Sequence, residues 1–332
     1  MIQLLTLSEA SDGQLADFFL VMTQKEEATT RNGKPYYRVA FRDAGGEVAF
    51  PIWSDATWAP ACRDDWQVGV FYKVRAVYRE SDYGPQLDIE KIREVNDADR
   101  ADGFSETMLL PQSRHPATEM FDELNSLVMD QIEGEPLKQL VLHILDSNHD
   151  SLLALPAAVY NHHAYVGGFL EHVLSVTKTA IMLANHYQKQ YPDLSPPLNR
   201  DLVVAGTALH DIGKLAELRQ AADGAHYTAA GELLGHIVLG RDLLRDAARE
   251  HELDAETQLR LEHIILSHQR LPEWGSPKPP MTPEALIVHY ADDLDAKYQM
   301  MYQTLSDDTS DNEFTTRRNP LHHPVFRGLD DG

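Results

Sequence analysis

The sequence predicts a two-domain protein in which a small all-β barrel precedes an all-α domain. Two observations lead to this fold class. Apolar and polar residues alternate with a period of two as far as about residue 95, and from about residue 118 apolar residues recur at helical spacings of three and four. The length of 332 residues also suits two domains of roughly 100–200 residues each.

Alternating runs predict five short strands in the first domain, residues 1–95. Turn signals rich in Gly, Asn, Asp and Pro separate these runs, which cover residues 14–22, 36–41, 47–53, 70–78 and 86–89. Five strands at this spacing are typical of a small closed barrel. Residues 96–118 are expected to form a linker, because the stretch is polar and contains Pro111 and Pro116.

Helical spacing predicts an all-α second domain, residues 119–305. The expected helices cover residues 119–146, 167–187, 200–217, 229–249 and 256–268. A last helix, ending at about residue 304, begins with Thr282 as its N-cap and Pro283 in its first position. Three glycines in the fourth helix indicate close helix packing, namely Gly231, Gly235 and Gly240. The polar tail, residues 306–332, is expected to be loose.

Composition excludes several classes of protein. The chain has 29 Lys and Arg against 52 Asp and Glu, a net charge of −23, which excludes a uniformly basic nucleic-acid-binding surface but allows a local basic strip. One cysteine, Cys62, excludes an internal disulfide framework and fits the reducing cytoplasm, where we expect the protein. No signal peptide and no run of about 18 apolar residues is found, so we expect no membrane partner.

A metal site is predicted by His and Asp residues that lie in otherwise apolar helical segments. The five segments carry His172, the pair His210-Asp211, His236, His263 with His268, and Asp292. Burying one neutral polar group without a partner costs about 2–7 kcal/mol. One buried histidine is usually a hydrogen-bonded core residue, but five helices that each contribute an imidazole or a carboxylate indicate a shared metal site.

The order of these residues resembles the HD-domain metal-dependent phosphohydrolases. Their pattern is His … His-Asp … Asp, with further histidines in members that hold two metals. Two longer segments, residues 155–172 and 282–297, resemble the YhaM-type 3′–5′ exoribonucleases. That family joins an N-terminal OB-fold to a C-terminal HD domain, which agrees with the barrel and helices expected here. This chain departs from the resemblance at Ser267-His268-Gln269-Arg270, where the family commonly has Ser-His-His-Gly.

The resemblance implies a role for each candidate residue. The implied metal ligands are His172, His210, Asp211, His236, His263, His268 and Asp292. Asp211 would bridge two divalent ions, with Mn²⁺ the expected metal and Mg²⁺, Fe²⁺ or Co²⁺ the alternatives. Asp211 and Lys214 are the expected catalytic residues, and Lys214 either holds a phosphate oxygen or forms an ordinary salt bridge.

Several roles stay open at this point. His263 and His268 are five positions apart, about 140° around a regular helix, so the two cannot easily bind one metal together, and either could be the ligand. His163 is expected to contact a phosphate or to be a structural hydrogen bonder. His289 and Asp295 flank Asp292 by one turn, so we expect them to orient ligands or to lie on the helix surface.

Aromatic and basic residues are interleaved in the predicted barrel, as they are in OB-folds that stack bases on aromatic rings and follow the backbone with cations. Tyr37, Trp53, Lys73 and Arg75 are the expected substrate-binding residues. The alternative is a barrel that serves only subunit assembly.

The predicted function is a divalent-metal-dependent 3′–5′ exonuclease that hydrolyses single-stranded RNA to nucleoside 5′-monophosphates, as the resemblance implies. Single-stranded DNA is a second candidate substrate, and we expect a homo-oligomer. Two alternatives remain. One is an HD-type phosphodiesterase acting on a small nucleotide or a cyclic dinucleotide, although a small substrate needs no single-strand groove. The other is a non-catalytic RNA-binding regulator, which the intact ligand set disfavours.

Overall fold

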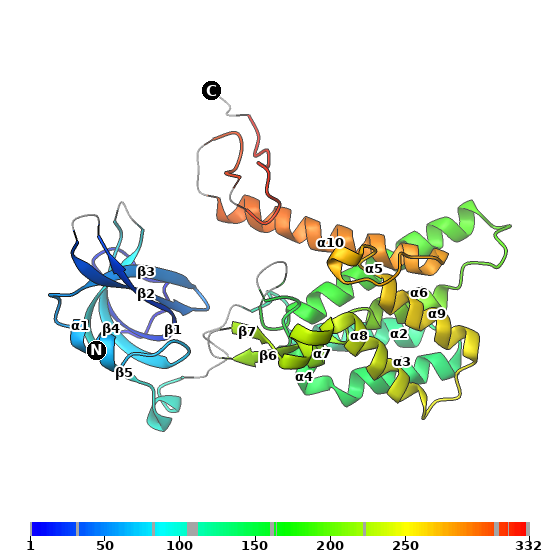
Figure 1. Cartoon of the computed structure of the whole chain (residues 1–332), viewed down its shortest axis with the longest axis horizontal. Coiled ribbons are helices and arrows are strands. Elements are labelled where there is room, and N and C mark those ends of the chain that lie inside the picture. Colours follow the sequence, from blue (N-terminus) through cyan, green and yellow to red (C-terminus); the bar gives the residue numbers. More distant parts are fainter. Residues whose placement is uncertain are drawn as a thin grey trace. The chain divides into compact units, whose positions relative to one another are not determined.

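The chain folds into two compact units, as the sequence predicts (Figure 1). One comprises Met1–Gln112 with Ala221–Gly224, and the other comprises Ser113–Gln220 with Ala225–Gly332. The computed structural model describes residues 2–30, 33–81, 84–104, 112–159, 163, 165–221, 224–308, 312–317 and 319–329. Parts of the predicted linker, of the segment 155–172 and of the tail lie outside the described residues.

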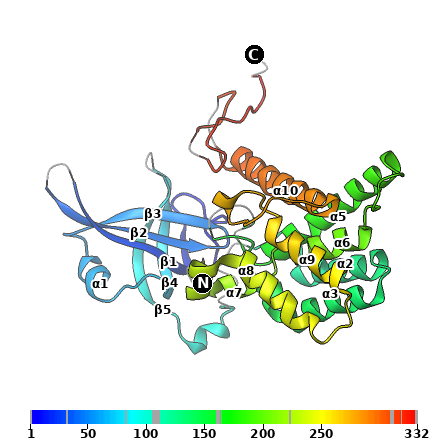
Figure 2. The same cartoon turned by 45° about the vertical axis from the view of Figure 1, so that its right-hand side comes forward.

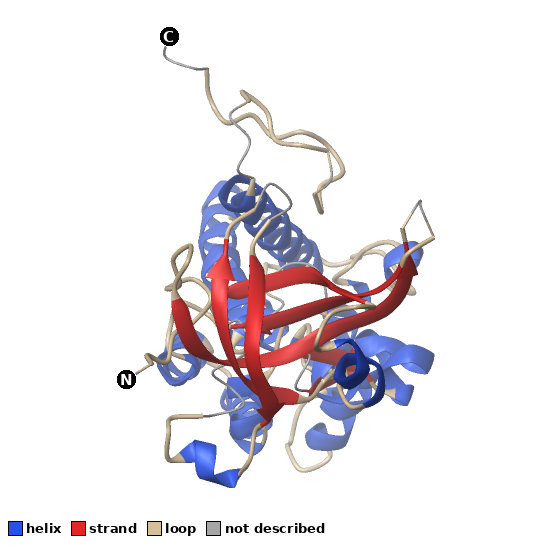
Figure 3. Ribbon diagram, turned by 90° about the vertical axis from the view of Figure 1, so that its left-hand side faces the viewer, coloured by secondary structure: helices blue, strands red, loops and turns tan. Residues whose placement is uncertain are grey.

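The first unit is a five-stranded antiparallel barrel-like sheet, drawn in red in Figure 3. Its strands, in the order β3-β2-β1-β4-β5, are β1 (Leu15–Thr29), β2 (Pro35–Asp43), β3 (Gly46–Trp53), β4 (Phe71–Arg79) and β5 (Gln86–Glu94). The short helix α1 (Ala59–Asp64) connects β3 to β4. A central β1 that pairs with both β2 and β4 is the strand order of an OB-fold, so the predicted fold class is confirmed.

The first strand is longer than the sequence pattern predicts. Its apolar half ends at Met22, and its polar half continues to Thr29 in register with β2. A bulge between Met22 and Gln24 separates the halves. The polar half lacks the alternation that marks a half-buried strand, which is why the prediction stopped at residue 22. Alternate residues of the apolar half, such as Phe18 and Leu20, are fully buried in the core of this unit.

The second unit is helical apart from a small hairpin (Figure 2). Its helices are α2 (Ala117–Gln131), α3 (Glu135–Ser147), α4 (His149–Ala154), α5 (Gly168–Gln190), α6 (Arg200–Leu209), α7 (Lys214–Glu217), α8 (Ala229–Ala248), α9 (Ala255–Ser267) and α10 (Pro283–Asp307). The hairpin consists of β6 (Leu218–Ala221) and β7 (Gly224–Tyr227). The 3₁₀ turns are η1 (Asp97–Arg100), in the first unit, and η3 (Pro272–Trp274), in the second. None of the described helices is both long and apolar enough to cross a membrane.

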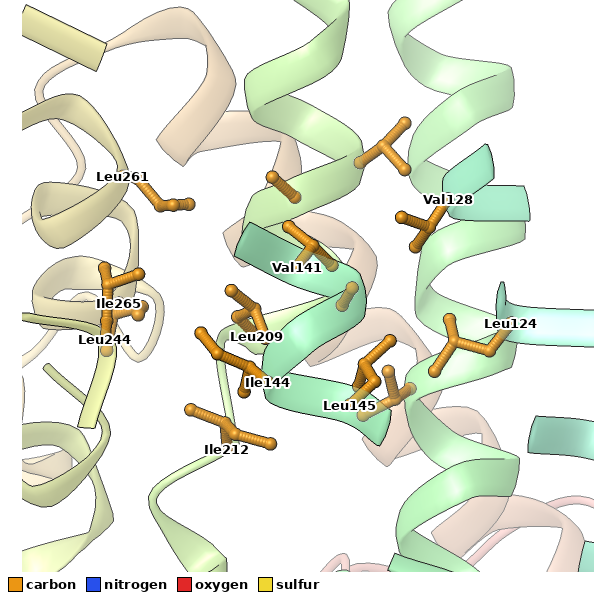
Figure 4. Packing of buried hydrophobic residues seen from close by; sticks show 14 of the residues in the cluster. Leu124, Val128, Val141, Ile144, Leu145, Leu209, Ile212, Leu244, Leu261 and Ile265 are labelled. Carbon is orange, nitrogen blue, oxygen red and sulfur yellow. The ribbon is translucent and has the colours of Figure 1, made fainter. Parts of the chain in front are cut away.

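Helix α6 is the centre of the second unit. Every residue from Leu202 to Leu209 is buried. Figure 4 shows Leu209 and Ile212 packed among side chains of α3, α8 and α9, including Ile144, Leu244 and Ile265. A helix buried all round places the residues at its C-terminal end inside the fold. The His210-Asp211 pair comes directly after Leu209 and is therefore buried with the helix.

Two predicted helices are interrupted. Residues 119–146 form α2 and α3, separated where Gly134 and Pro136 begin a new helix. Residues 200–217 form α6, a tight turn and α7. Gly213 in that turn packs against α8, since a Cβ there would lie 1.9 Å from the His236 carbonyl oxygen.

The predicted packing role of the α8 glycines holds for two of the three. Gly231 and Gly240 pack against Glu217 and Gly213. Gly235 has a φ of +73° and bends the helix, and a Cβ there would meet no atom within 4 Å, so the predicted packing role was wrong for this glycine. This left-handed conformation favours glycine, and it changes the direction of the chain directly before His236.

A buried carboxylate in η1 stabilises the first unit. Asp99 is 1% exposed and accepts hydrogen bonds from Arg93 at 2.6 and 2.7 Å, and from the Asn96 N–H at 2.9 Å. The Arg93 hydrogen bonds lower the pKa of Asp99 well below its usual range, despite burial. Because its folded-state pKa is depressed, Asp99 stabilises the fold at neutral pH, and this stabilisation is lost as the pH falls through that pKa.

We expect Asp99→Asn to lower the free energy of unfolding by about 1–3 kcal/mol at pH 7, because charge-assisted hydrogen bonds are lost. The difference from the wild type should shrink only below about pH 4, the ordinary pKa of an aspartate. Tryptophan fluorescence during urea unfolding measures it, since Trp53, Trp58 and Trp66 all lie in the first unit. Equal stability of the two proteins at pH 7 would contradict this explanation.

Candidate metal centre

Four imidazoles and two carboxylates meet at the inner end of α6. His172 comes from α5, His236 follows the bend in α8, His268 caps α9, and Asp292 comes from α10. His210 and Asp211 come directly after α6. The imidazoles of His172, His210 and His268 are fully buried, and Asp211 is 2% exposed. Five helices therefore place nitrogen and oxygen donors in one protected location.

The first donor group contains His172, His210 and Asp292. The distance from His172 Nε2 to Asp292 Oδ1 is 3.2 Å, and from His172 Nε2 to His210 Nε2 it is 3.4 Å. His210 Nε2 lies 3.8 Å from Asp292 Oδ1. One donor atom from each residue lies within 4.8 Å of the others, a spacing that suits a common metal ion.

The second donor group contains Asp211, His236 and His268. Asp211 Oδ1 lies 3.3 Å from His236 Nε2 and 3.5 Å from His268 Nε2. The other carboxylate oxygen, Oδ2, faces the first group, at 3.5 Å from His210 Nε2 and 3.7 Å from His172 Nε2. Asp211 thus presents one oxygen to each group, which is the arrangement of a bridging ligand.

Two atoms of the second group test whether these residues fit a metal ion. Asp211 Oδ1 and His268 Nε2 are buried, and neither makes a hydrogen bond within the described part of the chain. Leaving buried polar atoms unsatisfied costs free energy. A cation between them would satisfy both, and a mixed set of imidazoles and carboxylates suits first-row divalent ions. The residues therefore fit divalent metal binding.

Each imidazole is oriented by a contact at its other nitrogen. The Nδ1 atoms of His172, His210, His236 and His268 lie 2.7, 2.8, 3.0 and 2.8 Å from Asp295 Oδ2, the Thr207 carbonyl, Glu217 Oε1 and the Ile265 carbonyl, respectively. Each of these acceptors takes a hydrogen bond from Nδ1–H. Nε2 is therefore the ring nitrogen that faces the other metal-binding residues. Of these four partners, the sequence predicts only Asp295, as a residue that orients a ligand or lies on the helix surface. In the structure Asp295 contacts His172 and so has the orienting position.

The electrostatics keep the carboxylates ionised. Burial would raise the pKa of Asp211, but Lys214 and the surrounding imidazoles lower it well below its usual range. Burial alone would lower the pKa of His172, yet its hydrogen bonds to Asp292 and Asp295 raise it to about 9. For His210 burial dominates and lowers the pKa to about 4. The centre thus combines ionised carboxylates with imidazoles, which are donor types that divalent cations bind.

The structure brings six of the seven predicted ligands together and places His263 elsewhere. His263 Nε2 accepts a hydrogen bond from the Met281 N–H at 2.9 Å. Lys214 Nζ lies 2.5 Å from Asp211 Oδ2, so it forms the salt bridge that was the alternative to phosphate binding. His163 is 4% exposed, and its two ring nitrogens contact Tyr165 and Asp295. These contacts fit the role of a structural hydrogen bonder, which was the alternative to phosphate binding. His289 contacts the His268 carbonyl at 2.7 Å.

A cleft of about 660 Å³ opens onto the second donor group. It is lined by Asp211, Lys214, His236, His268 and Asp292, and also by Gln269, Trp274 and Lys297. Gln269 lies where the sequence departs from the family pattern, and its Nε2 is 3.4 Å from His236 Nε2. The sequence drew attention to Gln269 only through that departure, and it gave no signal for Trp274.

The predicted substrate-binding residues of the first unit have mixed surroundings. Trp53 is 39% exposed, with its ring 5.2 Å from that of Tyr36, whereas Tyr37 packs partly against the core. Lys73 pairs with Asp102 at 2.7 Å, and Arg75 makes two contacts with Asp17, at 2.7 and 2.9 Å.

A basic pocket of about 490 Å³ was not predicted. In the register of β4 and β5, Lys73 lies opposite Arg93, and Arg75 lies opposite Lys91. These four residues line the pocket together with Asp17, Trp58 and Ile92. Like charges directly across a strand pair are destabilising, so two adjacent pairs of cations form an unusual surface.

The chain is similar to several known proteins. Residues 169–297 match the HD domain family. The 3′–5′ exoribonuclease YhaM of Bacillus licheniformis is 34% identical over 326 residues, which cover 95% of this chain and 96% of that protein. The solution structure of the second OB-fold domain of replication protein A from Methanococcus maripaludis is 13% identical, with a TM-score of 0.23, and covers 29% of this chain and 97% of that one. A crystal structure of a domain of that protein is 9% identical, with a TM-score of 0.23, and covers 28% of this chain and 97% of that one.

Asp295 provides a test of how the imidazoles are oriented. Asp295→Asn keeps the shape of the side chain but removes the charge that holds His172 and accepts a hydrogen bond from Ser175. We expect its affinity for Mn²⁺ to fall about 10- to 100-fold, the usual effect of losing such a contact. Calorimetric titration of metal-depleted protein measures it. Asp242→Asn, on the exposed side of α8, is the matched control, and an unchanged affinity in Asp295→Asn would contradict the proposed orientation.

Proposed function

The chain belongs to the YhaM family of 3′–5′ exoribonucleases, and we propose that it removes nucleotides successively from the 3′ end of single-stranded RNA. The products would be nucleoside 5′-monophosphates. The observation that carries this proposal is the likeness over 95% of the chain, combined with two neighbouring donor groups, each of which is approached by one oxygen of Asp211. The HD domain implies a dependence on divalent metal ions.

We propose that the centre holds two ions. His172, His210 and Asp292 would bind one, His236 and His268 the other, and Asp211 would bridge them. Four imidazoles make the set richer in nitrogen than Mg²⁺ prefers. We propose Mn²⁺, with Fe²⁺ or Co²⁺ as alternatives. When bound, divalent ions supply Lewis-acid activation of the scissile phosphate and of the attacking water.

The chain's own residues orient and charge the centre. Lys214 Nζ lies 2.5 Å from Asp211 Oδ2, so it holds this carboxylate in place and adds positive charge beside the donor groups. Increased negative charge on a phosphate at the cleft would be stabilised by this ammonium group. His163 lies 3.3 Å from Asp295, so it supports the carboxylate that orients His172.

The shape of the cleft supports an action on strand ends. The donor groups are buried between helices, and the adjoining cleft of about 660 Å³ is in the range of pockets for small ligands. A strand end can enter such a space more readily than a duplex. We therefore propose that trimming proceeds from an unpaired 3′ end and stops at stable secondary structure.

We propose that the first unit binds the rest of the strand. The exposed Trp53, and the basic pocket of Lys73, Arg75, Lys91 and Arg93, combine an aromatic ring with cations. Lys91 has no carboxylate within ion-pair distance among the described residues, so its charge is available to a phosphate. Single-stranded DNA as a second substrate, a homo-oligomeric assembly and a cytoplasmic location also remain proposals.

A trimming assay tests the activity. Incubation of 5′-labelled single-stranded RNA with the protein and Mn²⁺ should give a ladder that shortens from the 3′ end. A stable 3′ hairpin should stop the reaction, and Asp211→Ala should lose both bound metal and activity. Internal cuts at early times, or equal degradation of the hairpin substrate, would overturn the proposed exonuclease. Hydrolysis of a cyclic dinucleotide alone would favour a small-molecule phosphodiesterase.

Lys91 tests the basic pocket. Lys91→Glu should weaken binding of a 20-nucleotide strand and reduce the log–log salt slope by at least about 0.7, the effect of one phosphate contact. The wild-type slope should be shallow, of magnitude roughly 2–4, because a chain of net charge −23 offers few phosphate contacts. Lys189→Glu, an exposed residue of α5, changes the charge equally and is the control. Equal slopes for both variants would remove the pocket from the binding surface.

A further inference from the structure

A tryptophan outside the metal-binding set lines the same cleft. We propose that Trp274 is a stacking platform for the 3′-terminal base of the strand, so that the cleft binds a whole nucleotide with its phosphate at the donor groups. The identity of the ligand as a nucleotide rests on the proposed function. The location of the platform rests on the geometry of the cleft.

The cleft has two chemically different parts. Asp211, His236, His268 and Asp292 form a part that is rich in metal-binding donors. Trp274 and Lys297 line the same space and contribute an aromatic surface and a cation. A nucleotide has the matching pair of features, because its phosphate requires cations and its base offers a flat aromatic face. Metal binding requires no indole, so the donor groups do not explain why Trp274 lies there.

The indole of Trp274 is exposed although its backbone is fixed. Trp274 is 49% exposed and ends the 3₁₀ turn η3. Its N–H donates to the Leu271 carbonyl at 3.0 Å, and Gly275 comes next with a φ of +103°, which favours glycine. The fully buried Ser276 accepts a hydrogen bond from the Gln269 N–H at 3.1 Å. A large apolar ring held by an ordered turn is arranged for a ligand in advance, which lowers the entropy cost of binding.

The turn is directly connected to the metal centre. His268 caps α9, and only five residues separate it from Trp274. Arg270, between them, has a φ of +68°, a left-handed conformation that is uncommon for a residue other than glycine. Such conformations persist where the surrounding structure requires them, and they are frequent at functional sites. The sharp turn brings the chain from a donor imidazole back to the wall of the cleft.

Lys297 provides a cation over one face of the ring. Its Nζ lies 5.9 Å from the centroid of a Trp274 ring and 2.7 Å from Asp293 Oδ2. Lys297 is on α10, five residues after Asp292, so the helix that supplies a donor carboxylate also supplies this charge. The base would therefore stack on the face of Trp274 that Lys297 does not cover, with its phosphate directed toward the donor groups.

Binding of two probes tests the platform. Adenosine 5′-monophosphate carries a base, and ribose 5-phosphate does not. Calorimetric titration of the full chain with Mn²⁺ should give about 5- to 150-fold tighter binding of the first probe, the range for one stacked base. Trp274→Ala should abolish this preference, and Trp274→Phe should retain most of it. Tyr191 is an exposed aromatic residue that lines a separate groove of this unit, beside α5 and α10. Tyr191→Ala should leave the preference for adenosine 5′-monophosphate unchanged.

Each alternative result has a definite meaning. An unchanged preference in Trp274→Ala, or no preference in the wild type, would overturn the platform. A bound-metal content equal to that of the wild type shows that a variant is folded. If Trp274→Ala does not fold, Trp274→Phe still tests the platform. The RNA ladder assay is read separately. Its failure in the wild type would overturn the proposed function, whereas normal trimming without a base preference would overturn the platform alone.

Discussion

One buried carboxylate determines how the second unit is built. Asp211 directs Oδ1 at His236 and His268, and Oδ2 at His172 and His210. A charge in this position is costly unless it is paired, so the surrounding helices must converge on it. Helix α6 delivers it from the middle of the core, and the glycine at position 213 allows α8 to approach the turn that holds it.

Each of the four metal-facing imidazoles also makes a contact through its second ring nitrogen, Nδ1. Carbonyls of α6 and α9, a carboxylate of α7 and one of α10 each engage an Nδ1 atom. The outer contacts therefore come from the same helices that pack the core. This couples the geometry of the donor groups to the stability of the helical unit. It also explains why short elements such as α7 persist, because Glu217 orients His236 from there.

Much of the fold could be predicted from the sequence because it rests on local patterns. Alternation marked the strands, helical spacing marked most helices, and His or Asp in apolar segments marked six residues that do meet. The rest depends on tertiary contacts. The bend at Gly235 is a local left-handed conformation, and the turn after Leu209 is where Gly213 packs against α8. The position of His263 is set by its contact with Met281, which a helical wheel cannot show.

The pairing of Lys73 and Arg75 with acidic partners, and the position of Trp274 in the cleft, also involve residues distant in sequence. Both change the interpretation of a residue without changing any local pattern. In the first unit, Lys73 and Arg75 form ion pairs with carboxylates, so Lys91 is the better candidate for a phosphate contact. Its cross-strand neighbour Arg75 is neutralised by Asp17. In the second unit, the cleft joins donors from four helices to a turn that no periodicity predicts.

The central claim is that Asp211 bridges two metal ions, and crystals grown with Mn²⁺ test it most directly. Anomalous diffraction should show two peaks about 3.5–4 Å apart, the usual separation in two-metal sites. One should lie within ligand distance of His172, His210 and Asp292, the other of His236 and His268, with Asp211 contacting both. A single peak, or two peaks of which only one contacts Asp211, would contradict the bridging role.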